Sequence, residues 1–194
     1  MRLLLASSSE HKLREFAALL DPHGVDRLPA GVELGPEVGE TFAENALGKA
    51  RVAARATGRP VIADDSGIEA EALGGRPGIY SRRYAGEEAT DAENLAKLLA
   101  EAPAGSRLAY VCAIAYVDPG RGVEQVFSGR CTGRLADRPR GSGGFGYDPA
   151  FLPDDGPPGL TMAELPDAAK HAISHRGRAA RALVAWLDAA EHGE

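Results

Sequence analysis

Two adjacent carboxylates, Asp64 and Asp65, follow the apolar residues 61–63, and Ser66 and Gly67 come directly after them. The apolar run is typical of the end of a buried strand, and a glycine permits a tight turn there. Carboxylates at a strand end suit a divalent cation or a general base, but a solvated, aspartate-rich turn fits these residues equally well. Since side chains alternate across a strand, the two carboxylates are not expected to play equal roles.

Three consecutive hydroxyls, Ser7, Ser8 and Ser9, stand between an apolar strand at 3–6 and a predicted helix. Backbone N–H groups at the helix N-terminus, the hydroxyls and Lys12 in the first turn would together hold a phosphate group. Ordinary helix capping explains one of the three serines. No Walker A sequence is present, which excludes a P-loop NTPase.

Residues 141–146 read Gly-Ser-Gly-Gly-Phe-Gly and match the letters of the dinucleotide-binding motif G-x-G-x-x-G. That motif must follow a strand and open a helix, whereas prolines stand on both sides of this segment and no helix follows, so a Rossmann site is rejected. The glycines would let backbone N–H groups approach a ligand, and Phe145 offers a flat face to a nucleotide base. The alternative is a mobile loop with Phe145 in the core.

His171 and His175 are four residues apart and could share a helix face, as metal-binding pairs do. No glutamate lies between them and no third ligand stands out, so a zinc site is not favoured. Together with Arg176, His175 could instead donate hydrogen bonds to carbonyl oxygens of a ligand. The alternative is an ordinary helix start with Ser174 as the N-cap.

The elements that must position these groups alternate between strands and helices. Capping boxes that begin at Thr41 and Thr90 predict two helix starts, and an apolar stripe predicts a C-terminal helix from about Gly177. Residues 107–117 and 123–135 predict two strands joined by a tight turn. This hairpin means that the sheet cannot be wholly parallel. The chain therefore reads as a single α/β domain around a mixed sheet.

Composition excludes several classes of protein. The chain has 194 residues, 44% of them hydrophobic and 26% charged, which is typical of a globular protein. A net charge of −6 argues against a nucleic-acid-binding protein, although a local cluster of lysines can still bind a small anion. No apolar run reaches transmembrane length, so no membrane contact is expected. Cys112 and Cys131 form no C-x-x-C motif, and a reduced, cytoplasmic protein is predicted.

Several segments together resemble the inosine triphosphate pyrophosphatase family, whose members remove non-canonical purine nucleoside triphosphates. They occur in the family's order over nearly the whole chain, at 7–12, 37–46, 63–67, 74–81, 143–149, Lys170 and 174–176. Each segment is weak, but the ordered set is specific. The resemblance implies an elongated mixed β-sheet with flanking helices, two lobes around a central cleft, and a homodimer. It also implies one ITPase-like domain over residues 1–194.

The resemblance also implies the reaction and its residues. Water would attack the α-phosphorus of ITP, dITP or XTP and release pyrophosphate. Glu37 and Asp65 would hold Mg²⁺, and Asp65 would accept a proton. Strand alternation, unless a turn re-aims the side chain, would leave Asp64 to orient or support. Phe145 would stack on the base, while Lys170, His175 and Arg176 would complete the pocket and read its 6-oxo group. The substrate contacts implied are Ser7, Ser8, Ser9, Lys12, Lys49, Ser66, Phe145, Gly146, Tyr147, Asp148, Lys170, His175 and Arg176.

One departure from the family pattern lies in the serine segment. The family commonly has Thr-Gly-Asn where this chain has Ser7-Ser8-Ser9, so that Ser9 replaces a longer amide. The serine pattern also resembles the Maf-like pyrophosphatases, which share the broader fold, but the glycine-rich segment and residues 174–176 do not. Two other classes remain as alternatives: a nucleotide-binding module without catalysis, and a metal-dependent phosphatase that releases orthophosphate.

Overall fold

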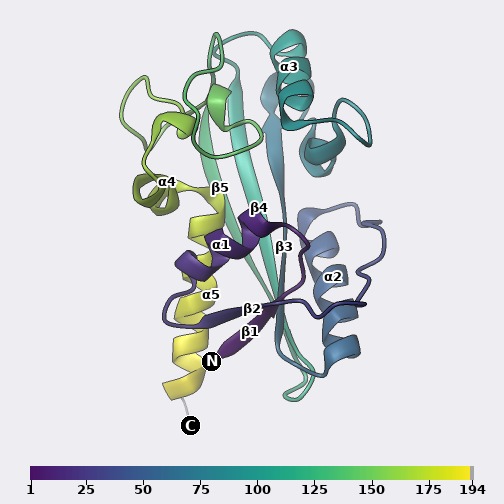
Figure 1. Ribbon diagram of the computed structural model, residues 1–194. Coiled ribbons are helices and arrows are strands. Elements are labelled where there is room, and N and C mark those ends of the chain that lie inside the picture. The colour runs from purple at the N-terminus through teal and green to yellow at the C-terminus, as the bar shows by residue number, and fades with distance from the viewer. Residues whose placement is uncertain (193–194) are drawn as a thin grey trace. The chain divides into compact units, whose positions relative to one another are not determined.

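The computed structural model describes residues 1–192 and has a mixed sheet of six strands in the order β2-β1-β3-β4-β5-β6 (Figure 1). The strands are β1 (Arg2–Leu5), β2 (Gly24–Arg27), β3 (Val61–Ala70), β4 (Arg107–Asp118), β5 (Val123–Leu135) and β6 (Phe151–Pro153). Strand β1 runs parallel to both β2 and β3, whereas β5 and β6 are antiparallel. The predicted mixed sheet is therefore confirmed.

Five α-helices accompany these strands in the described residues. They are α1 (Glu10–Leu19), α2 (Phe42–Thr57), α3 (Asp91–Glu101), α4 (Asp167–Ile173) and α5 (His175–His192). Both predicted capping boxes are present, since the Thr41 and Thr90 hydroxyls each accept the backbone N–H three residues on. Gly58 ends α2 with a φ of 65°, a left-handed conformation that favours glycine.

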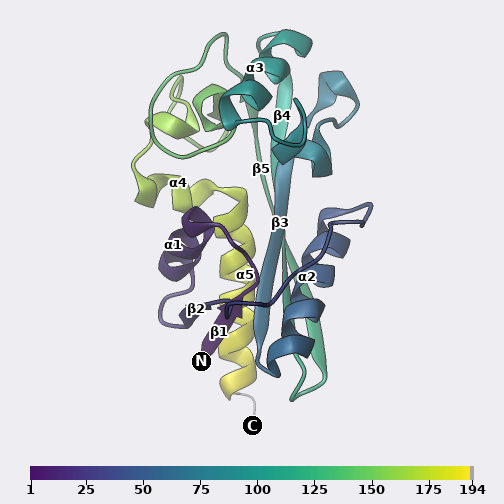
Figure 2. The ribbon, with the colours of Figure 1, turned by 45° about the vertical axis from the view of Figure 1, so that its right-hand side comes forward.

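The chain divides into two compact units. Unit 1 comprises Met1–Asp65, Cys112–Gly129 and Arg176–Glu194, and unit 2 comprises Ser66–Val111 and Arg130–His175. In unit 1, α1 and α5 pack on one side of the strands around Leu3, Phe16 and Leu183, and α2 lies on the other side (Figure 2). Unit 2 has a separate core that includes Leu98 of α3 and Phe151 of β6.

Three details differ from the sequence prediction. Strand β3 continues through Asp64 and Gly67 to Ala70, so the expected turn at Gly67 is absent. His171 and His175 do not share one helix, because Ser174 is extended, with a ψ of 154°, between α4 and α5. Strands β2 and β6 and helix α4 were not predicted from the sequence. Among residues 1–192, no helix combines the length and the apolar character needed to span a membrane.

Candidate functional site

Asp64 is the more deeply buried member of the carboxylate pair, at 1% exposure against 7% for Asp65. Its Oδ1 lies 2.9 Å from Lys12 Nζ in α1, and its Oδ2 accepts hydrogen bonds from Arg176 at the start of α5. Arg176 Nη1 also donates to Glu15 Oε2 at 2.8 Å. Burial works against a charge on Asp64, but Lys12 and Arg176 outweigh burial and hold the pKa of this carboxyl well below its ordinary value. Asp64 is therefore an ionised, firmly held group.

Asp65 has different partners, as the alternation of a strand predicts. Its Oδ2 accepts a hydrogen bond of 3.0 Å from Asn45 Nδ2, and its Oδ1 lies 3.7 Å from Lys49 Nζ, both in α2. Lys49 Nζ also donates to Glu37 Oε1 at 2.5 Å. Burial raises the pKa of Asp65; Lys49 opposes this effect and the charge of Glu37 adds to it. Two carboxylates thus flank one ammonium group in unit 1.

Asn45 is a site residue that the sequence interpretation did not single out. Its side-chain amide donates to Asp65, and its carbonyl accepts the backbone N–H of Gly39 at 2.8 Å. A side chain at position 39 would collide with Asn45 and Glu44, which explains the glycine. Asn45 therefore fixes the loop that carries Glu37 relative to Asp65. The sequence signal that could have identified Asn45 is the capping box at Thr41, because it places Asn45 in the first turns of α2.

The donor set at Lys49 fits Mg²⁺. Glu37 and Asp65 supply carboxylate oxygens, and Mg²⁺ is commonly held by one or two carboxylates together with waters and substrate phosphates. Within residues 1–192, no group of three or more His, Cys, Asp and Glu side chains is arranged to hold a metal ion. With Glu37 and Asp65 as its two carboxylate ligands, Mg²⁺ would take its other oxygen ligands from phosphate and water.

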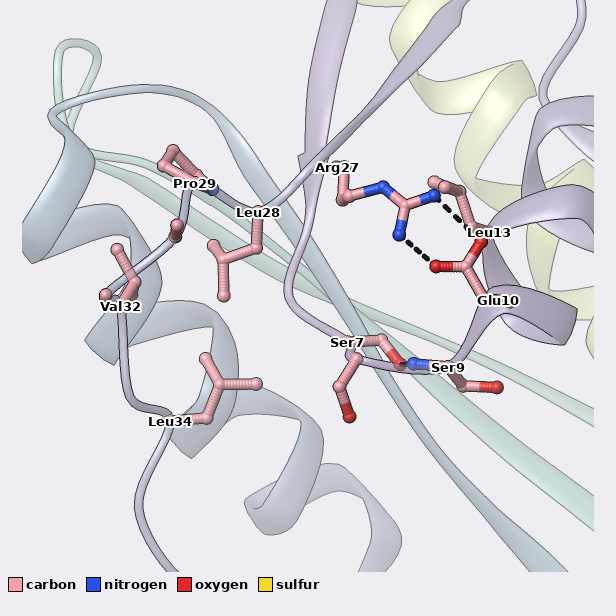
Figure 3. Close-up of a pocket in the computed structure, with 12 residues that line it drawn as sticks. Ser7, Ser9, Glu10, Leu13, Arg27, Leu28, Pro29, Val32 and Leu34 are labelled. Atoms are coloured by element: carbon pink, nitrogen blue, oxygen red, sulfur yellow. Dashed lines mark hydrogen bonds and ion pairs between the residues drawn. The ribbon is translucent and has the colours of Figure 1, made fainter.

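The three serines line a cavity of about 440 Å³ in unit 1 (Figure 3). Ser9 is the N-cap of α1, since its Oγ accepts the backbone N–H of Lys12 at 3.3 Å. Ser7 Oγ accepts the N–H of Ser9 at 3.2 Å. The ion pair of Arg27 and Glu10 also borders the cavity. Gly31 and six apolar residues complete the lining: Leu13, Leu28, Pro29, Ala30, Val32 and Leu34.

The glycine loop, residues 141–146, is anchored in unit 2 by Asp148. Asp148 Oδ2 accepts the backbone N–H of Phe145 at 3.0 Å and a hydrogen bond from Lys170 Nζ at 2.7 Å. Lys170 Nζ lies 5.0 Å from the centre of the Phe145 ring. Phe145 is 37% exposed, so the alternative that places it in the core is wrong. A side chain at Gly144 would collide with the Asp148 carboxylate, which requires a glycine there.

The other expected base-site residues of unit 2 are held by nearby groups. The buried His175 ring stacks on Tyr110, with centroids 4.6 Å apart and planes within 7°. Tyr110 was not singled out from the sequence. The Tyr147 hydroxyl donates to the backbone carbonyl of Ser81 at 2.6 Å. Ser66 continues β3 directly after Asp65 and is half-buried. These contacts fix the rings but leave the proposed substrate contacts as predictions.

The fold places the chain among mixed α/β proteins. The model of the Ham1 family matches residues 3–186, and the chain therefore belongs to the Ham1 family. The family resemblance read from the ordered motifs is thereby confirmed.

Curated relatives and solved structures agree with this assignment. A dITP/XTP pyrophosphatase of Geobacter sulfurreducens is 50% identical over 188 residues, covering 92% of each chain. A dITP/XTP pyrophosphatase of Nocardia farcinica is 47% identical over 97% of this chain and 95% of its own length. The structure of a HAM1 protein from Coxiella burnetii matches with a TM-score of 0.86 and 39% identity, over 97% of this chain and 98% of that one.

Proposed function

We propose that this protein hydrolyses non-canonical purine nucleoside triphosphates, namely ITP, dITP and XTP, to the monophosphate and pyrophosphate. Such a reaction would keep these nucleotides out of the nucleotide pool. The names of the curated relatives support the substrate class. The observation that carries the chemistry is the cluster in unit 1, where the carboxylates of Glu37 and Asp65 flank Lys49.

Unit 1 would carry the phosphate chemistry. The hydroxyls of Ser7, Ser8 and Ser9, with Lys12 and Lys49, would bind the triphosphate. The oxygen of a water molecule would attack the α-phosphorus, the bond from that phosphorus to the bridging oxygen would break, and the water proton would pass to Asp65. Burial raises the pKa of Asp65, which suits a proton acceptor. Mg²⁺ held by Glu37 and Asp65 would add positive charge next to the leaving pyrophosphate.

Unit 2 would recognise the purine. The exposed ring of Phe145 would stack on the base, bordered by Gly146, Tyr147 and Asp148. His175 and Lys170 would donate hydrogen bonds to the 6-oxo group. A base with an amino group at that position would leave the donors unpaired, which disfavours ATP. Arg176 is expected at the same base edge from the family resemblance, and it also donates hydrogen bonds to Asp64 and Glu15.

One incubation tests the proposal. The full chain is mixed with ITP and Mg²⁺, and the phosphorus products are identified by ³¹P NMR. Pyrophosphate with inosine monophosphate is the expected result. Orthophosphate would indicate a phosphatase instead, and bound but uncleaved ITP would indicate a binding module. ATP, which has an amino group in place of the 6-oxo group, is the comparison substrate in a second incubation. An equal rate with ATP would contradict recognition of the 6-oxo group.

We also propose a homodimer and a cytoplasmic location, both from the family resemblance. Light scattering after size exclusion would test the first, because a monomer has a mass of 20.3 kDa. A monomer at micromolar concentration would contradict the dimer.

A further inference from the structure

We propose that Asp91, in the first turn of α3, is a positioning residue that sets the place of Phe145 by holding the glycine loop. Its Oδ2 accepts a hydrogen bond of 2.9 Å from the backbone N–H of Gly146. Gly146 directly follows Phe145, and the two partners are 55 residues apart in the chain. The inference rests on the proposed function, in which Phe145 stacks on the purine base.

Two carboxylates hold the peptide groups on either side of Phe145. Asp148 accepts the N–H of Phe145 itself, and Asp91 accepts the next N–H along the chain. Gly146 has a φ of +62°, a left-handed conformation that favours glycine. Earlier in the loop, Gly143 N–H donates to the Ala163 carbonyl at 2.9 Å. Asp91 is thus the anchor that joins the end of the loop to a helix.

Helix α3 is a firm support for this anchor. Its capping box begins at Thr90, directly before Asp91, and Leu98 is fully buried in the core of unit 2. One turn further on, Asn94 donates to the Arg82 carbonyl and accepts the N–H of Ala85, both at 2.8 Å. Neighbouring residues of unit 2 are therefore tied to the same end of α3.

The expected effect is moderate and local. A carboxylate forms a stronger hydrogen bond to an N–H than a neutral acceptor does, but Asp91 is exposed and water competes for it. Loss of the bond should let the loop sample other conformations and lower the population in which Phe145 is placed for stacking. The groups proposed to bind phosphate lie in unit 1, outside this loop, so their contacts should be unaffected.

The test compares Asp91→Ala and Asp91→Asn in the full chain. We expect Asp91→Ala to raise the KM for ITP about fivefold with kcat within about twofold, as loss of one exposed hydrogen bond would. Competitive inhibition by inorganic tripolyphosphate, which has no base, should be unchanged. Asp91→Asn keeps an acceptor oxygen and should recover most of the KM. Since both variants remove the charge at the start of α3, their difference isolates the hydrogen bond.

A double variant separates positioning from general damage. If Asp91 acts through Phe145, then Asp91→Ala should have little further effect on KM when Phe145 is already alanine. Glu88→Ala, which removes an exposed carboxylate three residues away, is the control and should leave KM unchanged.

The outcomes also separate this inference from the proposed function. An unchanged KM in Asp91→Ala, an equally weakened tripolyphosphate inhibition, or full additivity with Phe145→Ala would overturn the positioning role. Failure of the wild-type chain to release pyrophosphate from ITP would overturn the proposed function itself. In that case, the affinities of the same variants for inosine monophosphate would still test whether Asp91 positions Phe145.

Discussion

Arg176 donates two hydrogen bonds to a single oxygen of Asp64, with Nε at 3.2 Å and Nη2 at 3.1 Å from Oδ2. Both residues are 1% exposed. The other oxygen of Asp64 lies 2.9 Å from Lys12 Nζ. Two cations from separate helices therefore hold the first carboxylate of the pair, which fixes the position of the strand residue next to Asp65. This arrangement supports the assignment of Asp64 as the supporting member.

Replacing Arg176 with alanine should destabilise the protein strongly. The substitution would leave Asp64 and Glu15 in a buried setting without their shared cation, and removal of one partner of a buried pair costs about 3–5 kcal/mol. Urea denaturation measures the free energy of unfolding. Arg176→Lys keeps the charge without the forked geometry. Its free energy of unfolding should lie between those of the wild type and Arg176→Ala. The exposed Arg181, changed to alanine, is the control on the same helix. An equal loss for the two alanine variants would contradict the role of this pair.

Asp65→Asn should abolish turnover while triphosphate binding persists. The amide cannot accept the proton of the attacking water, and loss of a general base lowers kcat by about a hundredfold or more. Single-turnover kinetics with ITP measure the chemical step, and calorimetry with a non-hydrolysable ITP analogue measures binding. Asp64→Asn is the matched variant, and its principal effect should be on stability, because its carboxylate is the partner of Lys12 and Arg176. Full activity in Asp65→Asn would refute the assignment of the base.

The sequence was most informative where structure depends on neighbours in the chain. The capping boxes at Thr41 and Thr90 were predicted correctly because a cap is made within one helical turn. Strand alternation likewise predicted that the two aspartates have different partners. The turn expected at Gly67 was wrong, since glycine permits a turn without requiring one.

Features that depend on distant pairing could not be predicted. Strand β2 has Val25 as its sole apolar residue, and its extended conformation comes from pairing with β1. The residue types of the candidate site were evident, but their partners were not. The contact of Arg176 with Asp64 was not predicted, because it spans 112 residues and is created by the packing of α5.

Asp26 should make the free energy of unfolding depend on pH under acidic conditions. Hydrogen bonds from Arg2 and Arg59 lower the pKa of Asp26 to about 2, against about 4 in an unfolded chain. The folded state therefore favours the ionised form, so this contribution is complete above about pH 4 and is lost as the pH falls toward 2. We expect Asp26→Asn to be less stable than the wild type at pH 6, with the difference shrinking below pH 4. Urea denaturation of both proteins at each pH measures this difference in the free energy of unfolding. A difference that does not change with pH would contradict the prediction.

If Mg²⁺ takes part as proposed, Glu37→Gln should raise the Mg²⁺ concentration that ITP hydrolysis needs. The substitution keeps the shape of the side chain and its ability to accept the hydrogen bond from Lys49, but it removes the charge proposed to hold the cation. Changes to groups around metal sites commonly weaken metal affinity about 10- to 100-fold, and loss of a direct ligand should cost at least about tenfold.

Titration of the ITP reaction with Mg²⁺ gives the concentration for half-maximal rate, and chelation should stop the wild-type reaction. Glu33→Gln removes an exposed carboxylate from the same loop and should leave that concentration unchanged. If the two variants need the same Mg²⁺ concentration as the wild type, Glu37 is not a ligand and its role is to pair with Lys49.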